Sequence, residues 1–378
     1  MQPARQVRDP KSKSKFPNPK MKIGLVRRGY SRTGGAEAYL RRFAEALLAI
    51  GHEVVLFTDR WPREEWPGSL IQVASSSPRS FADGLERMRS RDWCDYLFSL
   101  ERIWTCDAYR AGDGVHAAWL EQRTKFEPPW KAWLRHFSGK HREILALEKR
   151  LFSSTGAKTV IANSRFIKKQ IVRHFGYPEK QIHVVYNGVP SFSVPEGTRE
   201  QTRKELGLKE TDYAILFAGT GWERKGLRFA LAAMNAVRTP GAKLLIAGRG
   251  SSSGLPKTDR AQFLGPVKEM PRLLAAADAF ILPTLYDPFS NACLEALGAG
   301  LPVITSAFNG FAEIIKPGEQ GEVVAQPSDI AGLAAAIDRW GDPQRRETTR
   351  PPLQALAAKY NMPANVDRTL SVMGWSTT

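Results

Sequence analysis

A repeated alternation of short apolar runs and amphipathic helical segments is the feature that most constrains the fold. The strand-like runs lie at residues 22–26, 53–58, 70–74, 95–100, 158–163 and 183–189, and again at 213–219, 242–248, 261–265, 279–283 and 302–306. Between the first two runs, Leu40, Phe43 and Leu47 recur at helical spacing, which predicts a β-α-β unit. Parallel strands joined by helices form doubly wound sheets with buried strands. The sequence therefore predicts an α/β chain with two successive Rossmann-like sheets.

The length and composition of the chain suit two soluble domains. Its 378 residues exceed what one core normally holds, and the Pro/Gly-containing segment 190–200 predicts a boundary between domains at 21–189 and 190–355. Residues 1–20 are basic and proline-rich, which predicts a disordered leader, with a basic anchor to an acidic surface as the alternative. No apolar run of 18 residues and no signal-peptide pattern occurs. Three cysteines without CxxC spacing indicate a reducing compartment, so we expect a cytoplasmic protein.

The net charge of +17 points to a polyanionic partner, such as nucleic acid, an acidic lipid surface or a phosphorylated glycan. No RNP-type, zinc-finger or helix-turn-helix pattern stands out, so we expect no nucleic acid. Residues 103–150 fit neither predicted sheet and combine four tryptophans with many Lys and Arg residues. This composition suits a membrane interface, and a helical excursion whose tryptophans pack on the domain is the alternative.

The segment YDPFSNACLEALGAGLPVITS (286–306) carries the strongest chemical signal. It predicts a helix with Ser290 as N-cap, ending at residues 298–300. The amides of Ser290, Asn291 and Ala292 would then be free to bind a pyrophosphate at the helix N-terminus. Glu295 would face a bound ribose, and Asp287 would reach a hydroxyl of the attached sugar. The alternative is a surface acid beside a helix that caps itself.

Two loops that follow predicted strands supply further candidates for anion binding. GTGWERKG (219–226) places Arg224 and Lys225 after a strand, where they could neutralise a diphosphate, although such pairs are often merely solvated. GYSRTGGAE (29–37) places Gly34 and Gly35 before a helix, where the backbone could approach a ligand closely. The alternative for the second loop is an ordinary strand-to-helix turn.

Together these segments resemble the retaining GT-B glycosyltransferases of family 4, most closely the bacterial lipopolysaccharide core glucosyltransferases. The resemblance extends from Met21 over nearly the whole chain and includes segments 162–171 and 184–189. It implies that the first domain binds the acceptor and the second the nucleotide sugar. It also implies that a C-terminal helix, 356–378, including Trp375, packs back on the first domain.

The resemblance implies roles for the candidate residues. Arg224 and Lys225 would bind the donor diphosphate, Glu295 the ribose hydroxyls, and Asp287 would orient the transferred sugar. Asp287 replaces the usual glutamate and is one methylene shorter, which could change the sugar that is held. In YRAGDGVH (109–116), Asp113 aligns with an acid near the reacting sugar, and His116 is a weaker candidate whose alternative is a structural hydrogen bond.

The expected reaction is transfer of a hexose, glucose from UDP-glucose being the first choice, to a phosphorylated glycolipid or oligosaccharide at the cytoplasmic face of the inner membrane. No metal site is evident, and the basic pair would serve the purpose of a metal, so no metal or other cofactor is expected. The alternatives are transfer to another cell-envelope or capsular glycan, a hydrolase, epimerase or phosphorylase on the same scaffold, and a non-catalytic polyanion-binding protein.

Overall fold

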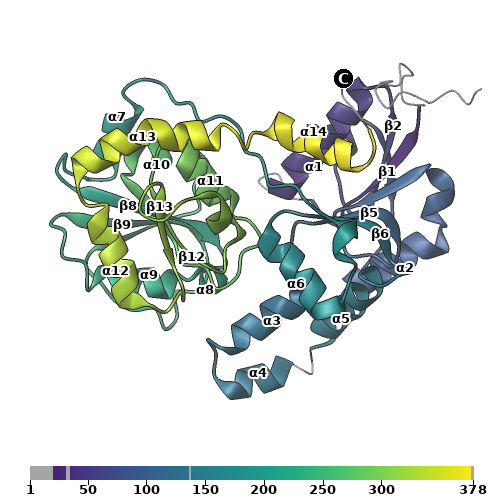
Figure 1. Cartoon of the computed structure of the whole chain (residues 1–378), viewed down its shortest axis with the longest axis horizontal. Helices are drawn as coiled ribbons and strands as arrows, with labels where there is room; N and C mark the ends of the chain where they lie inside the picture. Colours follow the sequence, from purple (N-terminus) through teal and green to yellow (C-terminus); the bar gives the residue numbers. More distant parts are fainter. Residues whose placement is uncertain (1–19, 31–34, 136–137, 376–378) are drawn as a thin grey trace, which may run out of the picture.

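The chain folds into two lobes, each built around one parallel sheet (Figure 1). The structure is a computed structural model and describes residues 20–30, 35–135 and 138–375. Most of the predicted leader at 1–20 lies outside the described residues, as does Gly34. No helix in these ranges is both long and apolar enough to cross a bilayer.

The first lobe contains a seven-stranded sheet in the order β3-β2-β1-β4-β5-β6-β7. Its strands are β1 (Lys22–Val26), β2 (Glu53–Thr58), β3 (Ser69–Gln72), β4 (Tyr96–Ser99), β5 (Cys106–Ala111), β6 (Ala157–Ala162) and β7 (Ile182–Val184). Its helices are α1 (Gly35–Ala49), α2 (Pro78–Arg87), α3 (His116–Thr124), α4 (Pro129–Arg135), α5 (Gly139–Leu151) and α6 (Arg165–Phe175). All strand pairs are parallel, and Leu25, Leu56 and Phe98 from three adjacent strands are fully buried.

The second lobe contains a six-stranded parallel sheet in the order β10-β9-β8-β11-β12-β13. Its strands are β8 (Tyr213–Thr220), β9 (Ala242–Arg249), β10 (Ala261–Gly265), β11 (Ala279–Leu282), β12 (Val303–Ser306) and β13 (Gly321–Val324). Its helices are α7 (Thr198–Glu205), α8 (Trp222–Lys225), α9 (Leu227–Met234), α10 (Met270–Ala276), α11 (Asn291–Gly298), α12 (Ile330–Arg339) and α13 (Pro343–Ala357). The prediction of two successive doubly wound sheets is confirmed.

Both sheets reverse their strand order once, between β1 and β4 in the first and between β8 and β11 in the second. Ligands of open α/β sheets bind at such switch points, beyond the carboxyl ends of the strands. The segments that leave these strand ends include Arg27 after β1, the loop before α8, and the loop before α11. The topology therefore directs them to one place between the lobes.

The structure corrects three of the strand predictions. Residues 103–150 do contribute to a sheet, because Cys106–Ala111 form β5 between β4 and β6. Strand β13, Gly321–Val324, was not predicted. Residues 261–265 form an edge strand rather than a buried one, and the side chain of Phe263 is 50% exposed there.

The chain returns to the first lobe at its C-terminal end (Figure 1). Helix α13 lies on the second lobe, whereas α14 (Met362–Val372) lies beside α1. Just beyond α14, the Trp375 ring meets Tyr96 edge-on at 4.8 Å and lies 5.4 Å from the His52 ring. Two chain crossings, at 185–200 and at 358–361, thus join the lobes.

Candidate active site

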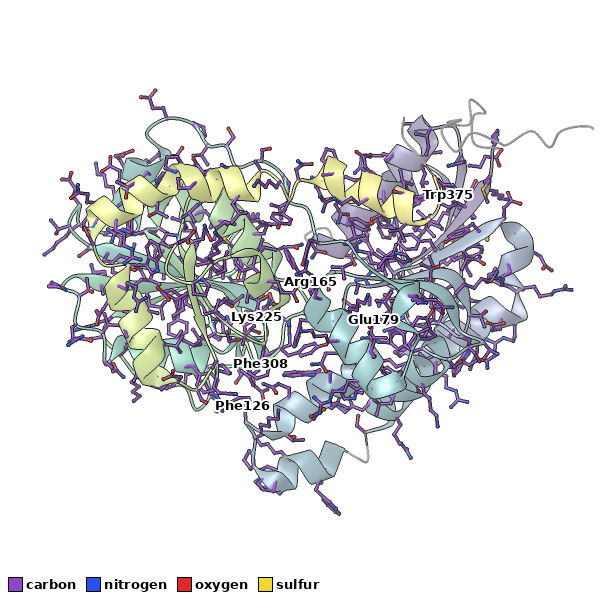
Figure 2. The ribbon with its side chains drawn as sticks, viewed as in Figure 1. Phe126, Arg165, Glu179, Lys225, Phe308 and Trp375 are labelled. Atoms are coloured by element: carbon purple, nitrogen blue, oxygen red, sulfur yellow. The ribbon has the colours of Figure 1, made fainter. Side chains whose placement is uncertain are left out.

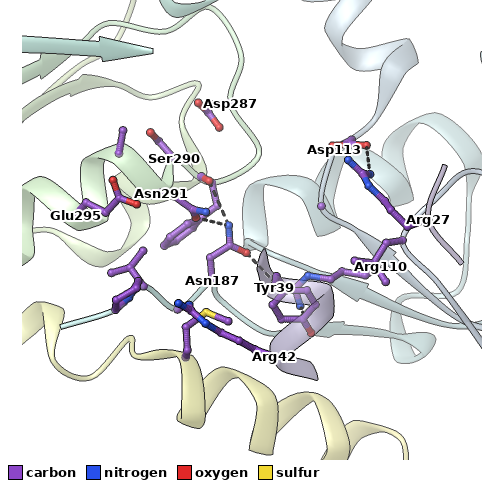
Figure 3. A pocket seen from close by; sticks show the side chains of 18 of the residues that line it. Arg27, Tyr39, Arg42, Arg110, Asp113, Asn187, Asp287, Ser290, Asn291 and Glu295 are labelled. Atoms are coloured by element: carbon purple, nitrogen blue, oxygen red, sulfur yellow. Dashed lines mark hydrogen bonds and ion pairs between the residues drawn. The ribbon is translucent and has the colours of Figure 1, made fainter. Parts of the chain in front are cut away.

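A cavity of about 550 Å³ lies between the lobes, where the carboxyl ends of both sheets meet (Figure 3). Side chains from both lobes line it, and most of the predicted site residues are among them. The lining includes Arg27, Tyr39, Arg42, Arg110, Asp113 and Asn187 on one side and Arg224, Lys225, Asp287, Ser290, Asn291, Ala292 and Glu295 on the other. The sequence motifs are therefore brought together with residues that no motif identified.

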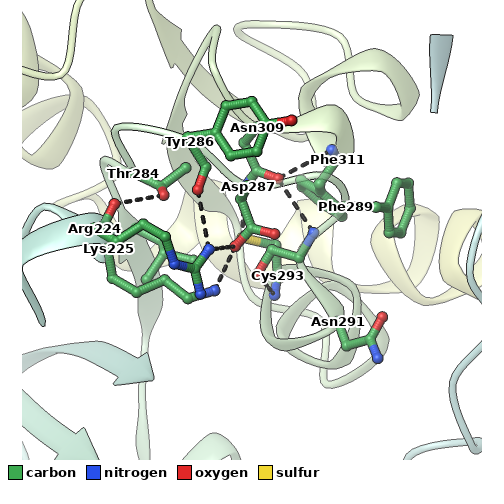
Figure 4. Close-up of polar contacts among 12 residues, drawn as sticks. Arg224, Lys225, Thr284, Tyr286, Asp287, Phe289, Asn291, Cys293, Asn309 and Phe311 are labelled. Atoms are coloured by element: carbon green, nitrogen blue, oxygen red, sulfur yellow. Dashed lines mark hydrogen bonds and ion pairs between the residues drawn. The ribbon is translucent and has the colours of Figure 1, made fainter. Parts of the chain in front are cut away.

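Arg224 and Lys225 are held by the turn that follows β8 (Figure 4). They end the short helix α8, and Gly226 follows with φ +78°. A Cβ atom at Gly226 would lie 1.9 Å from the carbonyl oxygen of Pro283, so only glycine allows this turn to pack on the neighbouring loop. The packing aims both basic side chains at the loop before α11.

Asp287 lies between these two cations. Its carboxylate forms an ion pair with the Lys225 ammonium and lies 3.9 Å from the Arg224 guanidinium, which also donates to the carbonyl of Tyr286 at 3.0 Å. The sequence assigned the acid and the basic pair to different parts of the donor. The structure joins them in one charge cluster with a net charge of +1, which leaves one positive charge to meet an anion.

The N-terminus of α11 opens into the cavity. Ser290 is the N-cap, as predicted, and its side chain accepts from the amide of Cys293 at 3.3 Å. The prediction that the Ser290 amide is free is wrong, because this amide donates to Asn309 Oδ1 at 3.2 Å. The amides of Asn291 and Ala292 have no acceptor in the part of the chain that the structure describes, so these two can bind an anion.

Glu295 lies one turn further along α11 and points toward the cavity (Figure 3). Its carboxylate makes no hydrogen bond or ion pair to any other described residue. Burial raises the pKa of Glu295 above its usual value. Hydrogen bonds donated by ligand hydroxyls would stabilise this half-buried carboxylate. Such bonds are those expected if Glu295 binds a ribose.

Asp113 lies on the opposite side of the cavity, after β5. Its side chain is 54% exposed, and one oxygen lies 3.7 Å from the guanidinium of Arg27. Arg27 also pairs with Glu37 at 3.1 Å and Glu101 at 2.9 Å. Burial raises the pKa of Glu101 to about 7, against the opposing effect of Arg27. Three acids thus fix Arg27, and Asp113 is the one that solvent and ligand can reach.

His116 is placed differently from Asp113. It is not among the residues that line the cavity, and its Nε2 lies 2.9 Å from Nδ1 of His141. Burial lowers the pKa of His116 to about 3, so the ring is neutral at physiological pH. These contacts agree with the structural alternative for His116 and give it no direct contact with a ligand in the cavity.

Gly114 allows the lobes to meet beside Asp113. It has φ +70°, and a Cβ atom there would lie 2.6 Å from the hydroxyl oxygen of Tyr286 in the second lobe. That hydroxyl accepts from the amide of Val115 at 2.8 Å. Phe126, labelled in Figure 2, follows α3 and makes a second contact between the lobes, because Arg228 donates to its carbonyl at 3.0 Å. The Asp113 segment is therefore positioned by both lobes.

Other candidate residues remain outside the cavity or outside the described ranges. Gly35 begins α1, whereas Gly34 belongs to the undescribed residues 31–34. No group of three or more His, Cys, Asp or Glu residues in the described ranges is arranged to hold a metal ion.

Sequence reasoning missed Arg27, Tyr39, Arg42, Arg110 and Asn187. Arg27 directly follows the first strand, and this position at the carboxyl end of a parallel strand could have identified it. Asn187 lies in the quoted segment 184–189 but received no role; its side chain donates to Asn291 Oδ1 at 2.8 Å across the cavity. Arg110 likewise lies in the quoted segment 109–116 but received no role, and Tyr39 and Arg42 lie inside α1, where nothing in the sequence distinguishes them.

Two family models match the chain. Residues 212–341 match the model described as glycosyl transferases group 1, and residues 108–191 match glycosyltransferase family 4. The first match includes the α8 turn and α11, and the second includes Asp113 and the end of the first lobe. The two models thus meet at the cavity.

Similar proteins with curated names are glycosyltransferases. The lipopolysaccharide glucosyltransferase WaaG of Escherichia coli is 25% identical over 323 residues, covering 79% of this chain and 83% of WaaG. The glycogen synthase of Mycobacterium tuberculosis is 28% identical over 353 residues, covering 80% of this chain and 81% of that protein. An uncharacterized glycosyltransferase of Methanocaldococcus jannaschii is 30% identical over 224 residues, covering 54% of this chain and only 57% of its own length.

Solved structures share the fold over nearly their full length. WaaG, described as a glycosyltransferase involved in lipopolysaccharide biosynthesis, aligns with a TM-score of 0.77 at 20% identity, covering 93% of this chain and 99% of WaaG. Anabaena HepE in complex with UDP-glucose aligns with a TM-score of 0.69 at 18% identity, covering 93% and 99% of the two chains. At these identities the structural matches establish the two-lobed GT-B architecture.

Proposed function

The chain belongs to the family 4 glycosyltransferases of the GT-B fold and is similar to lipopolysaccharide core glucosyltransferases, and from this we propose that it transfers glucose from UDP-glucose to a glycolipid acceptor, with retention of configuration. The observation that carries the proposal is the anion site on the second lobe. There, Arg224, Lys225 and two free α11 amides face one cavity beside the unpartnered carboxylate of Glu295.

The donor fits this site by chemistry. Diphosphate oxygens would accept from the amides of Asn291 and Ala292 and would share the positive charge of the basic pair. The ribose hydroxyls would donate to Glu295. HepE, a protein of the same fold, binds UDP-glucose, which supports a UDP-sugar as the donor.

The reaction requires charge stabilisation more than proton transfer by the protein. As the glycosidic bond breaks, negative charge develops on the leaving diphosphate, where Arg224, Lys225 and the α11 amides stabilise it. A phosphate oxygen of the leaving group would then accept the proton of the incoming acceptor hydroxyl on the same face of the sugar, which retains the configuration. Asp113 and Asp287 would orient the sugar from opposite sides. The basic pair supplies the charge that a metal would otherwise supply, so we propose a metal-independent reaction.

The acceptor side faces a membrane in this proposal. Helix α4 projects below both lobes (Figure 1), and its three large apolar side chains are exposed: Trp130 59%, Trp133 61% and Leu134 51%. The Lys131 ammonium lies 5.3 Å from the centre of the Trp130 ring. Tryptophan with adjacent lysine suits a headgroup region, so α4 would hold the enzyme at the cytoplasmic face of the inner membrane.

The double variant Trp130→Ser/Leu134→Ser should weaken binding to vesicles that contain anionic lipid. Both side chains lie on α4 and are exposed, so the free energy of unfolding should change little. Cosedimentation with vesicles at two salt concentrations measures the effect, and Trp93→Ser is the matched control, since Trp93 is 48% exposed outside α4. Equal loss in both variants, or binding that ignores salt, would reject α4 as the membrane contact.

A donor titration tests the catalytic proposal. UDP-glucose at a hundred times its Kd should stabilise the fold by about 2.7 kcal/mol, and extracted lipopolysaccharide core should then accept glucose, detected by mass spectrometry. Stabilisation without any transfer would support a non-catalytic binding protein. Transfer to a glucan instead of a lipid would support the alternative acceptor that similarity to a glycogen synthase suggests.

A further inference from the structure

Two arginines on the first-lobe side of the cavity have no role in donor binding or in the charge cluster around Arg27. Arg110 extends from β5 and Arg42 from α1, and both line the cavity. Neither forms an ion pair with any described residue. In Figure 3 they lie together with Tyr39 and Asn187, apart from the Arg27–Asp113 pair.

Arg110 is the more constrained of the two. Its side chain is 5% exposed, yet its partners are neutral: the guanidinium lies 4.1 Å from the centre of the Tyr39 ring and donates to Asn187 Oδ1 at 2.9 Å. A buried charge without a counter-charge is destabilising, and proteins retain one where a ligand supplies the opposite charge. Tyr39 and Asn187 hold the guanidinium in place without neutralising it.

Arg42 adds a second guanidinium, which is exposed and lines the same cavity. Its neighbour on the helix, Arg41, does not line the cavity and pairs with Glu45 at 3.1 Å. Of these two arginines of α1, Arg42 is therefore the one that faces the cavity. Two guanidinium groups that line one cavity without a carboxylate partner match the charge of a phosphate dianion, and each can donate hydrogen bonds to its oxygens.

We propose that Arg42 and Arg110 form a subsite for a phosphate monoester on the acceptor. This inference rests on the proposed function and deepens it, because it assigns the phosphate of the expected phosphorylated acceptor to two named residues. The donor diphosphate has its own cations, Arg224 and Lys225, on the other lobe. The subsite would anchor the acceptor's phosphate and leave a hydroxyl of the same acceptor directed at the transferred sugar.

Calorimetric titration of the full chain, saturated with UDP, tests the subsite with glucose 6-phosphate as the probe and glucose as its neutral match. Glucose 6-phosphate should bind at least tenfold more tightly than glucose. Arg42→Ala should weaken glucose 6-phosphate binding about tenfold or more, since it removes hydrogen bonds to a charged group. Arg41→Ala, one residue away, should leave it unchanged, and Arg42→Ala should leave the Kd of UDP unchanged.

Arg110→Lys keeps the positive charge but loses the planar guanidinium group, so this variant should also bind glucose 6-phosphate more weakly. The unfolding temperature of Arg110→Lys shows whether β5 tolerates the substitution. If this variant is unstable, Arg42→Ala alone tests the subsite. Equal binding of glucose and glucose 6-phosphate, or of the probe to wild type and Arg42→Ala, would overturn the subsite. So would a parallel loss of UDP affinity, which would assign the arginines to the donor. If wild-type protein binds glucose 6-phosphate but does not bind UDP, the proposed function is contradicted, whereas the phosphate subsite is still supported.

Discussion

Lys225→Ala should lower kcat/KM for glucosyl transfer by about 30- to 900-fold, corresponding to roughly 2–4 kcal/mol of transition-state stabilisation. The Lys225 side chain is only 13% exposed, and its ammonium is fixed by Asp287 at the cavity. Such a preorganised cation acts where charge develops on the leaving diphosphate, and it does so without the cost of rearranging solvent. The Arg224 guanidinium, 3.9 Å from Asp287, would remain and prevent complete loss.

Initial rates with UDP-glucose and a calorimetric Kd for UDP separate the two contributions of Lys225. The kcat should fall more than the Kd rises, because the leaving diphosphate carries more charge in the transition state than in the bound donor. Lys316→Ala is the matched control, since Lys316 is 75% exposed and pairs with Glu319 at 3.6 Å, outside the cavity. Turnover of Lys225→Ala equal to that of the control would contradict the assignment of the basic pair.

The two-sheet fold could be predicted because most strands are continuous apolar runs. Strands β1 and β2 begin and end where the sequence predicts, since parallel strands bury both faces and their ends coincide with polar residues. Strand β5, CDAYRA, was missed because Asp107 and Arg110 interrupt its apolar pattern. Those side chains are buried through specific partners: Asp107 pairs with Arg91 at 2.6 Å, and Arg110 stacks on Tyr39. Local pattern cannot reveal such long-range compensation.

The second-lobe part of the candidate site could also be predicted, because its chemistry is encoded in short segments. A helix N-terminus after a parallel strand and a basic pair after another strand are local features, and the structure places both at one cavity. The ion pair between Lys225 and Asp287 joins residues 62 positions apart, so the sequence could not show that Asp287 offsets one of the two positive charges.

Apart from Asp113, the first-lobe part of the site was not predicted, because three of its residues, Tyr39, Arg42 and Arg110, occupy ordinary positions in regular elements. Arg42 occupies one position of an amphipathic helix that also carries Arg41, and only the packing of α1 decides which of them faces the cavity. For the tryptophan-rich segment 103–150, the sequence likewise could not show which tryptophans pack on the domain and which are exposed. Trp104 donates to Asp83 at 2.8 Å and belongs to the fold, whereas Trp130 and Trp133 are exposed on α4.

Glu148→Ala should lower the free energy of unfolding of the first lobe by about 3–5 kcal/mol. The Glu148 side chain is 0% exposed and pairs with Arg102 at 2.8 Å. It also accepts from the amides of His116 at 2.6 Å and Ala117 at 3.1 Å. Its removal leaves the Arg102 guanidinium, which is only 13% exposed, without its counter-charge and leaves two amides without their acceptor. Urea unfolding followed by fluorescence measures the loss, and Glu143→Ala on the same helix should change stability by less than about 0.5 kcal/mol.

The same substitution should also affect catalysis, because Arg102 links Glu148 to the segment that carries Asp113. Arg102 donates to the carbonyl of Gly114 at 2.8 Å, and the adjacent Val115 amide donates to the hydroxyl of Tyr286 in the second lobe. Glu148→Gln keeps the shape and one acceptor oxygen, so this variant should fold while holding the segment less firmly. We expect its kcat to fall and its Kd for UDP to stay near that of wild type, since the donor site lies on the other lobe. A variant that loses stability but keeps full kcat would show that Glu148 supports the fold without positioning Asp113.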